Sequence, residues 1–110
     1  MQYGLTFIVD MRDFDEGVDL HVLTMPGDYI RMRKWAEENI PEADDDDMVA
    51  TLRRNYAIAW FALKRRGKLA EHGLPEELTV EAVDAMADRF SVYLNEVDQS
   101  NLPLPQEPPR

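Results

Sequence analysis

The side chains that most often carry catalysis or hold metals are few in this sequence and lie far apart. There is no cysteine, and neither His21 nor His72 belongs to a metal-binding motif such as H-E-x-x-H. Ser91 and Ser100 lack the G-x-S-x-G context of a hydrolase nucleophile, and the five glycines are too scattered for a phosphate-binding loop. We therefore expect no catalytic residue, no metal and no cofactor, and a protein that acts by binding.

The acidic run EADDDD, residues 42–47, is the densest group of potential ligands. It lacks the spaced ligands, central glycine and distal glutamate of an EF-hand calcium loop. The simpler interpretation is a solvated loop whose last residue, Asp47, caps the next helix, because carboxylates are favoured at the positive end of a helix. A docking surface for a basic partner is the remaining alternative.

A helix predicted over residues 47–67 is the element around which the rest of the chain should pack. Apolar side chains recur there at helical spacing: Leu52, Tyr56, Ala59, Trp60 and Leu63. Further apolar residues fill the opposite side, and a helix that is apolar on most faces is normally covered on most faces. We therefore predict a central buried helix, ended by Gly67 or Gly73.

The first 23 residues alternate between apolar and polar side chains in two stretches. A polar loop ending in Gly17 separates them, which predicts an antiparallel hairpin over about residues 2–23. Because a hairpin alone is marginal in water, it should lie against the helices. The face expected to be buried holds Leu5, Phe7, Val9, Leu20 and Val22.

Two more helices are predicted, over residues 27–39 and 80–97. Pro41 follows the first, and Thr79 is in position to cap the second. The second is expected to pack antiparallel to the central helix. Four prolines among the last eight residues predict a flexible tail over residues 99–110. The predicted fold class is α+β, mostly α, with one domain over residues 1–98.

Length and charge limit the function classes. A chain of 110 residues forms one domain, and a formal net charge of −10 argues against direct binding to nucleic acid. The N-terminal sequence MQYGLTFIVD does not read as a signal peptide, and no apolar run reaches the ~20 residues of a membrane span. We expect a cytoplasmic protein that binds neither membrane nor nucleic acid.

Positive charge is concentrated in one segment of this acidic chain. Residues 48–73 contain six Lys or Arg and one Glu. The simpler interpretation is intramolecular pairing with the acidic segment that follows. A phosphate-binding patch is the alternative, although the segment shows no interleaved exposed aromatic residues in the sequence pattern.

Four strings resemble the small tail assembly chaperones of long-tailed bacteriophages, particularly phages of actinobacteria. They are DYIRMRKWAEEN (28–39), YAIAWFALKRRGK (56–68), LTVEAVDAMADRF (78–90) and VDQSNLPLP (97–105). The resemblance implies a non-enzymatic protein of the bacterial host cytoplasm that is absent from the finished virion. It would bind the tape-measure protein and keep it soluble while the tail tube assembles. Many such chaperones also have a longer form made by ribosomal frameshifting.

A chaperone of this kind needs an exposed apolar groove for a helical partner. The candidate partner-binding residues are Tyr29, Trp35, Tyr56, Trp60 and Tyr93. For Tyr56 and Trp60 a core position is the favoured interpretation, whereas Trp35 is expected to be partly exposed. Self-association through the apolar central helix is a further option.

Two other classes compete with this interpretation. An acidic inhibitor could mimic nucleic acid and block a host nuclease or DNA-binding protein; its carboxylates should lie on one exposed face and its binding should weaken steeply with salt. A regulatory adaptor is the other class, but nothing in the sequence singles it out.

Overall fold

A computed structural model describes residues 7–41 and 47–96. Along the chain the elements are β1 (Phe7–Asp13), β2 (Val18–Leu23), α1 (Pro26–Asn39), α2 (Met48–Arg65), η1 (Ala70–His72), α3 (Val80–Ala87) and β3 (Phe90–Glu96). Residues 2–6 of the predicted hairpin, most of the acidic run and the predicted tail lie outside the described residues. The α+β class is confirmed.

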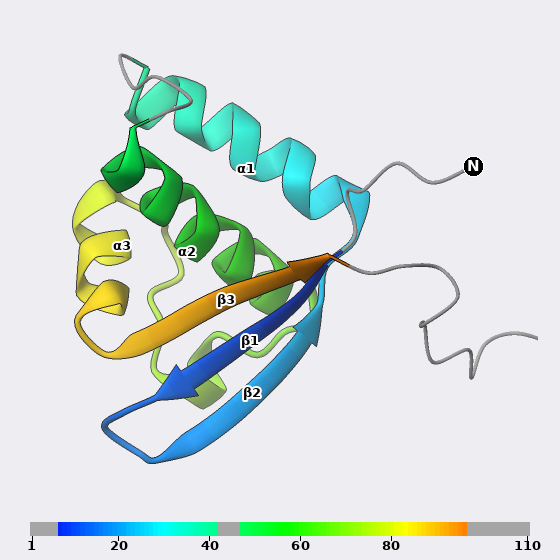
Figure 1. The fold of residues 1–110 in the computed structure, drawn as a ribbon, viewed down its shortest axis with the longest axis vertical. Helices are drawn as coiled ribbons and strands as arrows, with labels where there is room; N and C mark the ends of the chain where they lie inside the picture. The colour runs from blue at the N-terminus through cyan, green and yellow to red at the C-terminus, as the bar shows by residue number, and fades with distance from the viewer. Residues whose placement is uncertain (1–6, 42–46, 97–110) are drawn as a thin grey trace, which may run out of the picture.

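The three strands form one antiparallel sheet in the order β2-β1-β3. The predicted hairpin is confirmed, with Met11 opposite Leu20 and Asp13 opposite Val18. Because side chains alternate across a sheet, Val9, Met11 and Asp13 face the helices and are buried. In the described part of the chain no helix covers the opposite face of the sheet (Figure 1).

The third predicted helix is wrong beyond Ala87. Helix α3 spans only Val80–Ala87, and Phe90–Glu96 is strand β3, which pairs with β1. Phe90 and Leu94 are four residues apart, so they fit a helical period. Together with Val92 they also occupy every second position, so in a strand all three lie on one face. Pairing with β1 supplies the backbone hydrogen bonds that decide between the two periods.

Helix α2 lies between the sheet and α1 and contacts α1, α3, β2 and β3, so its predicted central position is confirmed (Figure 1). Asp47 caps its start, as predicted, by accepting from the N–H groups of Val49 and Ala50 at 2.9 and 3.2 Å. Gly67 ends it at φ +69°, a left-handed conformation that glycine adopts without strain.

Helix α3 packs against α2. Arg53 in α2 binds Asp84 in α3 through two hydrogen bonds of 3.0 Å, and the hydroxyl of Tyr56 reaches the carbonyl of Phe90, the first residue of β3. These contacts hold the first half of α2 against the end of α3 and the start of β3. The antiparallel direction of α3 relative to α2 stays a prediction.

Among the described residues no helix is both long and apolar enough to cross a membrane.

An ion pair with a buried carboxylate joins the end of β1 to the residue before β3, at one end of the sheet. Arg89 donates to both carboxylate oxygens of Asp13, from Nε at 3.0 Å and from Nη2 at 2.6 Å. The N–H groups of Asp15 and Glu16 also donate to Asp13. The hydrogen bonds from Arg89 are the largest cause that lowers the pKa of Asp13 from 3.8 to about 2.

This pKa predicts a specific loss of stability in acid. Because the pKa of Asp13 is lower in the folded than in the unfolded chain, its contribution is present above pH 3.8 and disappears as the pH falls to about 2. Urea unfolding measured across this window should show a smaller pH dependence for Asp13→Asn than for the wild type. Asp19→Asn, which removes a carboxylate from an exposed pair with Arg12, is the control and should keep the wild-type dependence. Parallel curves for wild type and Asp13→Asn would contradict the prediction.

Candidate functional site

Three of the five predicted partner-binding residues use their polar atoms to hold the fold. The indole N–H of Trp35 donates to the carbonyl of Leu78 at 2.8 Å, and that of Trp60 donates to the carbonyl of Pro75 at 2.9 Å. Both accepting carbonyls belong to the segment that connects α2 to α3. The two tryptophans therefore tie α1 and α2 to this connection.

Tyr56 makes the third tie. Its hydroxyl donates to the carbonyl of Phe90, at the start of β3, at 2.6 Å. The phenol is protonated at neutral pH and so can donate, and burial raises the pKa of Tyr56 further above its ordinary value. The core positions predicted for Tyr56 and Trp60 are confirmed.

The structure does not gather the five aromatic residues into one groove. Trp35, which was expected to be partly exposed, is only 7% exposed, so that prediction is wrong. The indole lies inside the domain, where its N–H donates to the carbonyl of Leu78, so this face of α1 is covered. Tyr29 is half-buried on α1, and Tyr93 is 68% exposed on the uncovered face of the sheet. Only Tyr29 and Tyr93 remain accessible to a partner.

An exposed apolar row at the start of α2 was missed. Met48, Val49 and Leu52 are 76%, 56% and 50% exposed. Leu52 had been placed in the buried stripe because it fits the helical period with Tyr56. The helical period places Leu52 on the same face of α2 as Tyr56. It does not show that α1, α3 and the sheet leave the first turn of this face exposed. The signal that could have found the row is its position directly after the cap Asp47, beside the acidic run.

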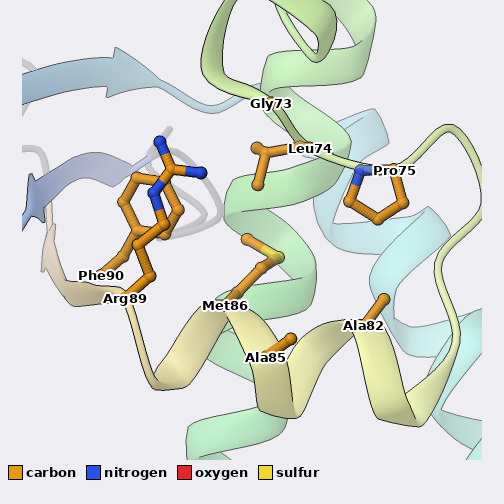
Figure 2. Close-up of a pocket in the computed structure, with 8 residues that line it drawn as sticks. All are labelled: Gly73, Leu74, Pro75, Ala82, Ala85, Met86, Arg89 and Phe90. Carbon is orange, nitrogen blue, oxygen red and sulfur yellow. The ribbon is translucent and has the colours of Figure 1, made fainter. Parts of the chain in front are cut away.

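An apolar slot lies between α3 and the segment before it (Figure 2). Leu74 and Met86 face each other across its middle, while Pro75 and Arg89 stand near its two ends. Its volume is about 170 Å³, and it is lined by Gly73, Leu74, Pro75, Ala82, Ala85, Met86, Arg89 and Phe90. A single apolar side chain of a partner is the kind of group that such a slot can hold.

The two histidines of the described residues each lie beside a carboxylate. No three His, Asp or Glu side chains among the described residues are placed to hold a metal ion. His21 contacts Asp10 on the uncovered face of the sheet, and His72 lies beside Glu71 in η1. No buried polar side-chain atom in this part of the chain lacks a hydrogen-bond partner, so none is left pointing into a cavity for a ligand.

Comparison of the chain with known protein families, with curated proteins and with solved structures found no match. The resemblance to tail assembly chaperones therefore stays a prediction.

The ties made by the aromatic residues predict how substitutions affect stability. Trp35→Phe keeps most of the buried ring but leaves the carbonyl of Leu78 without its donor, so the free energy of unfolding should fall by about 1–3 kcal/mol. Tyr93→Phe removes a hydroxyl from an exposed position and should change it by less than about 0.5 kcal/mol. Urea unfolding followed by far-UV circular dichroism, which does not rely on tryptophan fluorescence, measures both free energies. Equal stability of Trp35→Phe and wild type would show that the indole bond is not a structural tie.

Proposed function

We propose that this protein is a non-enzymatic tail assembly chaperone that binds a bacteriophage tape-measure protein and keeps it soluble during tail tube assembly. The observation that carries the proposal is the exposed apolar row Met48, Val49 and Leu52 at the start of α2. The resemblance of four sequence strings to such chaperones supports it independently. The proposed place of action is the cytoplasm of the bacterial host, and the finished virion would not contain the protein.

The row suits a helical partner because Met48 and Leu52 are one helical turn apart. A second helix laid along this turn would contact both side chains together with Val49. Tape-measure proteins are long helical chains with apolar stripes, so a chaperone must cover such stripes until the tube forms. A net charge of −10 would keep the complex soluble meanwhile. The slot beside α3 offers a second anchor point.

The acidic mimic of nucleic acid is the weaker candidate. In the described residues Asp13, Asp19, Asp28 and Asp84 each lie within ion-pair distance of an arginine of the same domain. Carboxylates that are already paired are poor substitutes for free phosphates. Of these four pairs, Arg53–Asp84 is the one that joins the basic segment 48–73 to the acidic segment that follows, as the charge distribution predicts.

The proposal can be tested by coexpression with the tape-measure protein encoded in the same genome. The soluble fraction of the tape-measure protein should rise when this chain is present. The double variant Met48→Ser, Leu52→Ser should lose about 2 kcal/mol of binding free energy, or ~30-fold in Kd, because two apolar side chains no longer bury their surface. Calorimetry with the purified complex measures the loss.

The matched control is Phe14→Ser, which removes an apolar side chain of similar exposure, 65%, from the hairpin loop. It should leave binding unchanged, and both variants should keep the wild-type melting temperature. Full solubilisation of the tape-measure protein by the double variant would contradict the assigned surface. Binding that disappears at high salt, together with capture of a purified nuclease, would favour the mimic instead.

A further inference from the structure

A pocket with three basic residues in its lining lies between α1 and the last turns of α2, two elements that lie side by side in Figure 1. Its volume is about 380 Å³, and its lining residues are Arg31 from α1 and Phe61, Lys64 and Arg65 from α2. Three of these four side chains are cationic in a chain whose net charge is −10. This local reversal of charge needs a physical explanation.

A buried carboxylate sets the positions of two of the cations. Asp28 is fully buried and accepts hydrogen bonds from Nη2 of Arg31 at 2.9 Å and from Nε of Arg65 at 3.1 Å. It also accepts from the backbone N–H of Met25 at 2.8 Å. Nη2 of Arg65 donates to the carbonyl of Leu23 at 3.0 Å. The guanidinium groups are therefore held in place before any ligand arrives, which lowers the entropy cost of binding.

Asp28 balances only part of the charge. Its carboxylate pairs with both Arg31 and Arg65, and Lys64 adds a third basic residue to the lining of the pocket. The Nζ atom of Lys64 lies over the Trp60 ring, 5.2 Å from its centre, a contact that leaves the ammonium group charged. Both arginines still have N–H groups that make no bond to Asp28.

The end of α2 does not require these cations as caps. The N–H of Gly67 donates to the carbonyl of Lys64 at 2.9 Å, and that of Lys68 donates to the carbonyl of Leu63 at 3.0 Å. These two bonds form a Schellman motif, in which backbone groups satisfy the terminal carbonyls. Capping of the helix therefore does not explain why the basic side chains converge on the pocket.

Phe61 adds an apolar wall. The side chain is half-buried, and its ring meets the Trp60 ring edge-on, with centres 5.0 Å apart. A ligand that fits this lining carries one anionic group on a flat apolar body. A polyanion is disfavoured, because the −10 charge of the whole chain repels it at long range.

We propose that this pocket binds an aromatic anion, with a carboxylate or phosphate monoester held by Arg31, Lys64 and Arg65 and the ring against Phe61. This site is separate from the apolar row at the start of α2. It does not depend on the chaperone function.

The test is a titration followed by amide NMR of the full chain with phenyl phosphate, benzoate and inorganic phosphate as probes. One or both aromatic anions should shift the amides of residues 61–65 saturably at millimolar concentration. Inorganic phosphate should bind several-fold more weakly, since it cannot contact Phe61. The tighter aromatic probe identifies the anionic group as carboxylate or phosphate.

Lys64→Gln should weaken the binding of whichever aromatic anion binds more tightly by about tenfold. The substitution removes a charge-assisted hydrogen bond but leaves the Asp28 contacts intact. Lys68→Gln makes the same change one turn further on, outside the pocket lining, and should change affinity by less than about twofold. Both lysines are at least partly exposed, so both variants should keep the wild-type fold. Absence of saturable shifts with either aromatic anion would overturn the proposal. So would equal binding by Lys64→Gln and wild type, or by inorganic phosphate and phenyl phosphate.

Discussion

The structure depends on the hydrogen bonds made by the polar atoms that helix α2 buries in the core. Trp60 and Tyr56 are buried almost completely, and each carries one donor that would be costly to leave unpaired. Both donors reach main-chain carbonyls outside the helix, at Pro75 and Phe90. Trp35 makes the equivalent bond from α1. Hydrophobic burial thus also fixes the connection between α2 and α3 and the start of β3.

Two buried carboxylates, Asp13 and Asp28, each join two further parts of the chain. Asp13 binds Arg89 and so joins the end of β1 to the turn before β3. Asp28 binds Arg65 and so joins the start of α1 to the end of α2. Ion pairs of this kind add little net stability beyond an apolar replacement, but removal of one partner leaves a buried charge. Their main effect here is to fix which elements meet, and around Asp28 they also hold the cations of a pocket in position.

The sequence was informative about elements with one strong period and much less so about exposure. Helices α1 and α2, the hairpin and the caps Asp47 and Thr79 follow from local patterns and are present. Strand β3 was missed because Phe90 and Leu94 fit two periods, and only pairing with β1 separates them. Residue type identified the large aromatic anchors. It could not show that Trp35 would be covered or that Leu52 would be left open, because both depend on where distant segments pack.

We propose that a helical partner binds at the start of α2 and not at Tyr93, the exposed aromatic residue of the sheet. Site-specific photocrosslinking tests it most directly, with a photoreactive residue placed at Leu52 in one variant and at Tyr93 in another. Each variant would be coexpressed with the tape-measure protein, irradiated and analysed by mass spectrometry. We expect crosslinks to the tape-measure protein from position 52 and none from position 93. Crosslinks from position 93 alone would contradict it and would place the partner on the uncovered face of the sheet.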